Sequence, residues 1–401
     1  MVPILLMLLQ TAALPVTDAA VIDDAGTITV TATRLEDLAT AAKRCEQYGC
    51  APREDIAVSV AYGSALFDAG KYLDAKRWLA AAVGRNKHSA RAEPLAVSQL
   101  YTAQATLAAH EGDQRTVRRA TWASRNVITD SAGLPAAARL NAEFRLADWQ
   151  LRAGETNEAQ SRFAAIAADA AAAGYPALAG LAELRRAIAL HALNRRSDSR
   201  ALLESLATRS SPGTDDVRRA ALALAARLAF IIGDTAAADG YVARLAEIAP
   251  GPEPVLVSSQ QLPSPTAQQA TDGFSPVFID RGPQSSALAG LRWVDIGFWI
   301  KPDGSVDDAA ILRGSPRLGW AQPLLGSIGA RRYSASTGTG SYRVERYTLT
   351  ADYSTPVGSL IRRRGANPRF EMMEMSAEPP APDAVSERRD MPDVRPSSAL
   401  P

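Results

Sequence analysis

Ala-Gly-Lys-Tyr at Ala69–Tyr72 is the stretch that decides the fold, because it recurs along the chain as the turn of a helical hairpin. Related turns follow at Glu111–Gln114, Ala153–Thr156, Leu193–Arg196 and Ile232–Thr235. The five turn residues are Gly70, Gly112, Gly154, Asn194 and Gly233, which lie 42, 42, 40 and 39 residues apart. A nearly constant period in this range is typical of stacked helical repeats, which bind partners rather than perform chemistry.

Small residues recur at fixed offsets from each turn. Seven residues before the turn come Gly63, Ala105, Ala147, Ala187 and Ala226, and five residues after it come Ala75, Val117, Ala159, Ser199 and Ala238. Two helices cross closely where small side chains face each other. The pattern resembles the tetratricopeptide repeat, although these units are longer than that family's period of about 34 residues. The resemblance implies an all-α solenoid over residues 53–250.

The composition limits the function classes. The chain has 401 residues, of which 47% are hydrophobic, which allows two or three folded domains. It carries 44 basic and 43 acidic residues, a net charge of +1. This balance gives no general attraction to nucleic acid or to an anionic membrane.

The N-terminus favours export. Residues 1–20 contain the apolar run Pro3–Leu9 followed by small residues, which indicates a signal peptide, although no Lys or Arg precedes the run. The alternative is a short uncleaved anchor that associates weakly with the membrane. Residues 21–52 are predicted to hold an extended segment, a helix at Asp37–Gly49 and a cysteine loop.

The two cysteines, Cys45 and Cys50, predict a local disulfide if the chain is exported. The alternative is a pair of free thiols. No second cysteine pair completes a zinc site.

The C-terminal third has a different composition. Residues 251–276 are rich in proline and read as a linker, and residues 362–401 are predicted to be a disordered tail. Between them, residues 277–361 predict a small module with the order strand, turn, strand, helix and strand. Its elements are Trp293–Ile300, Pro302–Gly304, Val306–Arg313, Leu318–Ile328 and Tyr342–Tyr353.

This order, together with Gly314-Ser315 and Arg331-Arg332-Tyr333, is similar to the C-terminal domain of TonB-type energy transducers. The resemblance implies an α+β multidomain protein, a β-β-α-β module and a place in the periplasm of a Gram-negative bacterium. In that family the module adds a strand from an outer-membrane receptor to its sheet edge. The partner-strand residues implied here are Tyr342, Val344, Arg346, Tyr347 and Leu349. The alternative is an ordinary sheet edge protected by its charges.

One segment resembles the TonB box that such receptors carry. It consists of Ile28, Thr29, Val30, Thr31 and Ala32, close to the expected mature N-terminus. One hypothesis is that it pairs with the last strand of its own or a neighbouring chain. The alternative is that five β-branched or small residues occur there by chance.

No catalytic arrangement is evident in the sequence. His88, His110 and His191 fall in different repeats at no metal-ligand spacing, and Trp78, Trp122 and Trp149 are expected in the core. The glycine-rich stretch Thr337–Gly340 precedes a strand, whereas a phosphate cradle precedes a helix. We therefore expect a protein that is not an enzyme and that uses no cofactor, metal or nucleic acid.

These features predict a periplasmic protein-interaction adaptor, related to TonB transducers and linked to outer-membrane transport through a receptor. The solenoid replaces the long spacer of a working transducer, which favours an adaptor over a motor component. The alternative is a cell-envelope scaffold whose solenoid binds a protein partner with no role in transport.

Overall fold

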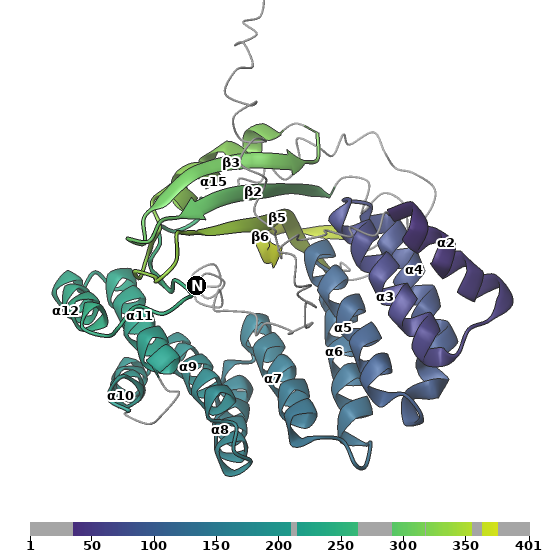
Figure 1. Cartoon of the computed structure of the whole chain (residues 1–401), viewed down its shortest axis with the longest axis horizontal. Coiled ribbons are helices and arrows are strands. Elements are labelled where there is room, and N and C mark those ends of the chain that lie inside the picture. The colour runs from purple at the N-terminus through teal and green to yellow at the C-terminus, as the bar shows by residue number, and fades with distance from the viewer. Residues whose placement is uncertain (1–34, 210–214, 264–290, 317, 355–362, 376–401) are drawn as a thin grey trace, which may run out of the picture.

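The computed structural model describes residues 35–209, 215–263, 291–316, 318–354 and 363–375. Within them the protein is α+β: helices come first along the chain and antiparallel strands follow (Figure 1). The predicted signal peptide or anchor at residues 1–20 and the segment Ile28–Ala32 lie outside the described residues.

Each predicted turn joins two helices. Helix α2 (Leu35–Tyr48) comes first, and the short 3-10 helix η1 (Lys87–Arg91) follows the first hairpin. The five hairpins are α3 (Pro52–Asp68) with α4 (Tyr72–Asn86), α5 (Pro94–Glu111) with α6 (Gln114–Thr129), α7 (Ala136–Ala153) with α8 (Thr156–Ala172), α9 (Pro176–Ala192) with α10 (Arg196–Ala207), and α11 (Asp215–Ile231) with α12 (Thr235–Ala246).

The turn residues adopt the left-handed backbone conformation that ends a helix. Their φ angles are +73°, +81°, +83°, +61° and +80° for Gly70, Gly112, Gly154, Asn194 and Gly233. Glycine and asparagine adopt this conformation at little cost, which explains why they stand at these positions. Asp113 and Asp234 then cap the next helix, since each side chain accepts a hydrogen bond from a backbone N–H three residues later.

The small residues lie where the helices of a hairpin cross, as their spacing predicts. A Cβ at Gly63 would lie 2.6 Å from the side chain of Leu79 on the facing helix. In the fourth hairpin, Ser199 Oγ donates a hydrogen bond of 2.8 Å to the carbonyl oxygen of Ala187. Larger side chains at these positions would separate the helices.

The main sheet has four antiparallel strands in the order β3-β2-β5-β6. They are β2 (Arg292–Ile300), β3 (Val306–Gly314), β5 (Ser341–Ser354) and β6 (Arg363–Met375). The predicted turn between β2 and β3 closes through Gly304, whose φ is +81°. The predicted helix forms as η2 (Leu318–Ala321) followed by α15 (Gln322–Gly329).

Two predictions about the C-terminal third are wrong. Residues 363–375 of the predicted disordered tail form β6, because β5 supplies their backbone partners. Part of the predicted linker forms β1 (Leu256–Ser258), which pairs with β4 (Arg332–Tyr333). Val257 of β1 packs into the helical core against α11, so this part of the chain is not a free spacer.

The two faces of the sheet have different neighbours. Val294, Ile296 and Phe298 of β2 point toward η2 and α15 and form a core with Trp320 and Leu324. On the other face, Leu291, Trp293 and Met373 join the core of α3, α4 and α5. The sheet and the first hairpins therefore share one hydrophobic core.

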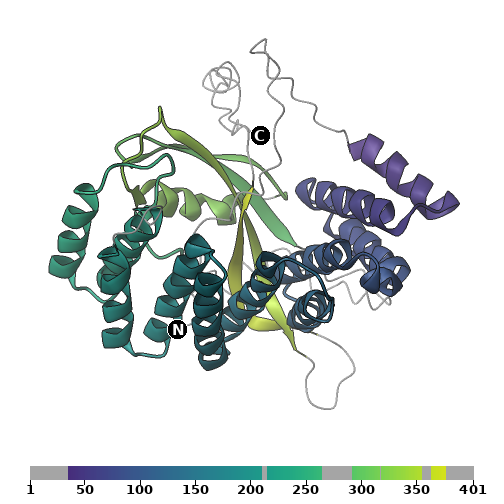
Figure 2. The same ribbon diagram turned by 60° about the horizontal axis from the view of Figure 1, so that its bottom comes forward.

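We call α2–α12 the helical arc. The arc curves around one side of the molecule, and the sheet spans its opening from α11 to α3–α5 (Figure 1). In the turned view of Figure 2 the yellow-green strands again lie against the blue helices. The strands thus face the inner side of the helical arc.

Candidate binding site between the helical arc and the sheet

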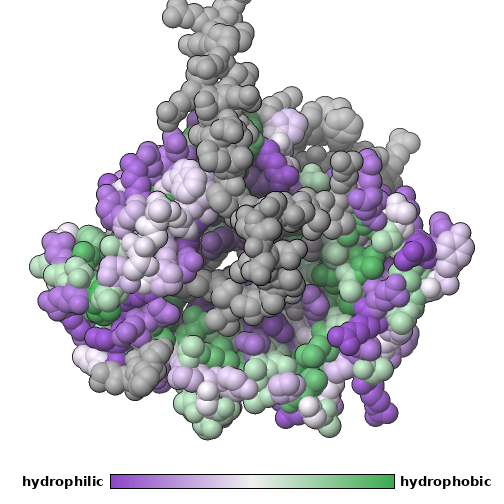
Figure 3. Space-filling view, in the orientation of Figure 1, coloured by the Kyte–Doolittle hydropathy of each residue, from purple (hydrophilic) through white to green (hydrophobic). Residues whose placement is uncertain are grey.

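A cavity of about 770 Å³ lies between the helical arc and the end of the sheet. The space-filling view shows the molecule hollowed near its centre (Figure 3). The cavity is lined by α5, α6 and α7 on one side and by β5 and β6 on the other. Its volume is in the range of pockets that bind small molecules or short peptide segments.

The cavity runs along the outer edge of β6. Glu371, Met372 and Met373 all line it, although successive side chains of a strand point to opposite faces of the sheet. Met372 packs into the core with α15, whereas Met373 packs into the core with α3–α5, so the two do lie on opposite faces. A cavity that touches both must lie beside the strand.

The other edge of β6 is already paired. Residues Arg369 to Met375 face Thr350 to Val344 of β5. In the described part of the chain no strand pairs with the opposite edge of β6, which therefore keeps backbone N–H and C=O groups available next to the cavity.

The lining contains arginines whose charges are not compensated. No hydrogen bond or ion pair joins Arg115, Arg118 or Arg145 to any other residue that the structure describes. All three are exposed residues; packing of neighbouring atoms around the guanidinium of Arg145 still lowers its pKa.

The carboxylates of the lining, in contrast, have partners. Asp352 accepts hydrogen bonds from Arg369 at 2.5 Å and from Gln114 at 3.1 Å. Glu371 lies 3.5 Å from Arg152 and 3.8 Å from Arg369. Asp148 lies 3.2 Å from Arg185, whereas Glu155, among the described residues, accepts a hydrogen bond only from the neutral Gln150. Against this one carboxylate without a cationic partner stand the three arginines, so the net uncompensated charge of the lining is positive.

Trp149 contributes an apolar part of the cavity wall. Its ring packs with Ala108, Val117 and Leu146, in agreement with the predicted core position. Its Nε1 is buried without a hydrogen-bond partner among the described residues, and it has almost no surface that a molecule in the cavity could touch. Trp149 therefore supports the wall through packing.

His110 also lines the cavity but carries no charge near neutral pH. Its Nδ1 lies 2.9 Å from Thr348 Oγ1, and its ring packs edge-on against Phe67. Burial and the nearby positive charge of Arg346 lower the pKa of His110 to about 3. A neutral histidine here contributes packing and a hydrogen bond between α5 and β5.

The structure contradicts the predicted partner-strand site. β5 lies between β2 and β6, so from Val344 to Leu349 its backbone is paired on both sides. Tyr347 and Leu349 are buried in the core with α15, and the Tyr342 ring lies 5.1 Å from that of Trp299. The prediction failed because residues 363–375 supply a further strand.

Arg346 holds the sheet to the helical arc. Its guanidinium donates to both carboxylate oxygens of Asp295, at 2.7 and 2.8 Å. It also donates to the carbonyl oxygens of Phe67 and Asp68 at the end of α3, at 2.5 and 2.7 Å. A cation is favourable at the C-terminal end of a helix, where the last carbonyls have no helical partners.

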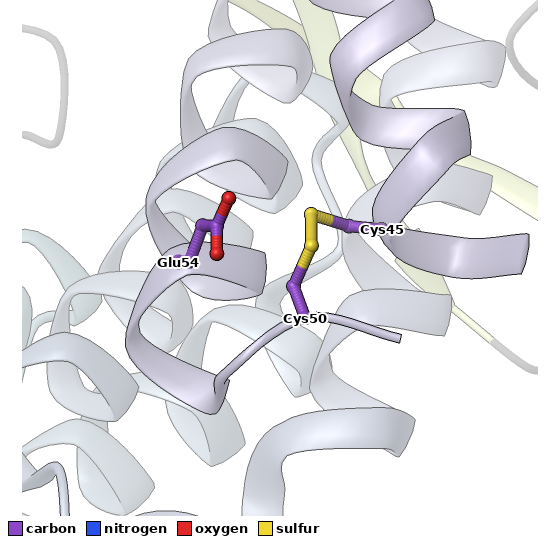
Figure 4. Close-up of side chains that lie close together, drawn as sticks. All are labelled: Cys45, Cys50 and Glu54. Carbon is purple, nitrogen blue, oxygen red and sulfur yellow. A yellow bond between two sulfur atoms is a disulfide. The ribbon is translucent and has the colours of Figure 1, made fainter. Parts of the chain in front are cut away.

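Cys45 and Cys50 form a disulfide, and Glu54 lies beside it (Figure 4). These three groups are close enough for a shared metal ion, but a sulfur in a disulfide is not the thiolate that binds zinc. In the oxidised state the group therefore links α2 to the start of α3.

Sequence reasoning missed Arg118, Arg145 and β6. One pattern points to the inner side of the helical arc: Arg145 and Arg185 each stand nine residues before a turn residue, and Arg185 reaches Asp148 on the neighbouring hairpin. Comparing positions relative to the turns would have placed both arginines on the same face.

In comparisons with known proteins, no family model, curated protein or solved structure matches this chain. Among the described residues, no helix combines the length and the apolar character needed to cross a membrane. The cavity and the strand beside it are therefore the features from which a function can be inferred.

Proposed function

We propose that this protein is a periplasmic interaction adaptor that captures an extended segment of another protein along the free edge of β6. The observation that carries the proposal is the position of that edge beside a cavity of about 770 Å³. An extended segment placed there would satisfy the free backbone groups of β6, which is the mode of binding called β-augmentation.

The helical arc supplies the second wall of the site. We propose that the hairpins form a tetratricopeptide-like solenoid and that α5, α6 and α7 contact the side chains of the captured segment. Backbone pairing alone does not distinguish one sequence from another, so specificity has to come from this wall.

The order β-β-α-β supports a relation to the C-terminal domain of TonB-type transducers. We propose that the partner is a segment of an outer-membrane receptor and that the protein acts in outer-membrane transport. The pairing edge differs from the one the resemblance implies, since β6 covers β5 and offers its own outer edge. The Cys45–Cys50 disulfide supports an oxidising compartment such as the periplasm.

Photocrosslinking in intact cells tests this function. A photoreactive amino acid replaces Met372 beside the cavity or, as a control, Leu312 on β3 at the opposite edge of the sheet. We expect the probe at position 372 to label one short segment of a receptor, identified by mass spectrometry, and the probe at position 312 not to label it. Equal labelling from both positions, or no labelling from position 372, would contradict the proposal.

A further inference from the structure

We propose that the segment captured at this site is acidic, with carboxylates at alternate positions that meet Arg118 and Arg145. This inference rests on the strand-capture function proposed above and adds the chemical class of the ligand. It follows from the charge of the cavity and from the spacing of side chains on an added strand.

The charge of the cavity favours anions. Three of its four carboxylates already pair with arginines, whereas Arg115, Arg118 and Arg145 have no partner among the described residues. A ligand carboxylate would pair with the Arg145 guanidinium through charge-assisted hydrogen bonds. A lysine at the same place would add a like charge beside these arginines, which is unfavourable.

The strand geometry determines the spacing of the acidic residues. On a segment paired with β6, every second side chain points to the same face, at intervals of about 7 Å. Arg118 of α6 and Arg145 of α7 both line the wall that faces the added strand. Two carboxylates two residues apart would both point to this wall, whereas two adjacent ones would point to opposite faces.

The charged donors of the cavity wall are guanidinium groups. Each guanidinium presents several N–H donors and no acceptor, so it selects for acceptor-rich side chains such as carboxylates.

Binding of three matched peptides to the full-length protein tests the inference. Each is a fluorescein-labelled eight-residue peptide in which valine alternates with glutamate, glutamine or lysine, measured by fluorescence anisotropy. We expect the glutamate peptide to bind at least about tenfold more tightly than the glutamine peptide, the effect of one or two charge-assisted hydrogen bonds. We expect the lysine peptide to bind more weakly still.

Two substitutions locate the effect. Arg118→Gln and Arg145→Gln should each weaken binding of the glutamate peptide about tenfold and leave the glutamine peptide unchanged. Arg119→Gln is the matched control, since Arg119 is an exposed neighbour on α6 that does not line the cavity. It should leave both affinities unchanged.

The outcomes separate this inference from the proposed function. If the glutamine peptide binds as tightly as the glutamate peptide, strand capture stands and selectivity for acidic segments is overturned. If none of the three peptides binds, strand capture itself is overturned. If Arg119→Gln weakens the glutamate peptide as much as Arg118→Gln does, the attraction is a general surface effect and the assigned contacts are wrong.

Discussion

Single residues connect the sheet to the helical arc, and Arg346 does so through both charge and packing. It pairs with Asp295 on β2, donates to the end of α3, and lies over the rings of Trp293 and Phe67 at 4.3 and 5.1 Å. The sequence placed this arginine on a strand at the sheet edge, where it would contact a partner strand or, in the alternative, protect that edge. Its true environment depends on contacts with residues almost 280 positions away, which local patterns do not show.

Replacing Arg346 tests its role. We expect Arg346→Ala to lower the free energy of unfolding by about 3–5 kcal/mol, because the buried Asp295 loses the buried one of its two arginine partners and the end of α3 loses a charged donor. Arg313→Ala is the control, since Arg313 also pairs with Asp295, at 2.8 Å, but its side chain is 53% exposed. Arg313→Ala should lower the free energy of unfolding by about 1 kcal/mol or less. Urea unfolding followed by circular dichroism measures both, and equal losses would contradict the assigned role.

At the scale of elements, the sequence predicted what local chemistry determines. The five hairpins were readable because each turn needs a residue that tolerates a positive φ, and the β2–β3 turn was readable for the same reason. Strand β6 was not, because it contains Gly365 and Pro368 among charged residues and has little strand propensity of its own. Its position at the sheet edge explains why proline is tolerated.

Substitutions at two equivalent turn glycines, Gly112 and Gly154, test how closely the turn of α5 and α6 approaches the sheet. A Cβ at Gly112 would lie 2.3 Å from the carbonyl oxygen of Ala351, whereas a Cβ at Gly154 would meet nothing within 4 Å. Both glycines have a positive φ, so Gly154→Ala should lower the free energy of unfolding by about 1–2 kcal/mol from backbone strain alone.

Gly112→Ala should lower the free energy of unfolding by about 1–3 kcal/mol more than Gly154→Ala does, because the turn must also move away from β5. Thermal unfolding of the two variants, compared with the natural chain, measures this difference. Equal losses in the two variants would show that the turn of α5 and α6 does not press against the sheet in solution.

On the scale of the whole molecule, the sequence indicated two modules joined by a linker, and the structure shows a shared core. Trp293 and Met373 pack with α3–α5, and Val257 packs with the last helices. Hydrophobic residues near the ends of predicted elements do not reveal which distant surface they cover. For the same reason the cavity, which is built from both parts, was not predictable from either part alone.

A shortened chain tests this shared core. In a protein that ends at Pro250, α3–α5 should exchange their amide hydrogens faster than in the full chain, because their core loses Leu291, Trp293 and Met373. Helix α8, which packs between α7 and α9, serves as the internal control, and its amide hydrogens should exchange as slowly as in the full chain. Hydrogen exchange followed by mass spectrometry reports both regions, and unchanged protection in α3–α5 would show that the two parts are independent.

The order of β5 and β6 along the chain has a consequence for biosynthesis. Synthesis proceeds from the N-terminus, so the helices and β2, β3 and β5 emerge before residues 363–375. Until those residues emerge, the edge of β5 that they cover in the folded protein lacks this partner. An open strand edge is a place where other chains pair and aggregate, so we expect the growing molecule to be most vulnerable at that stage.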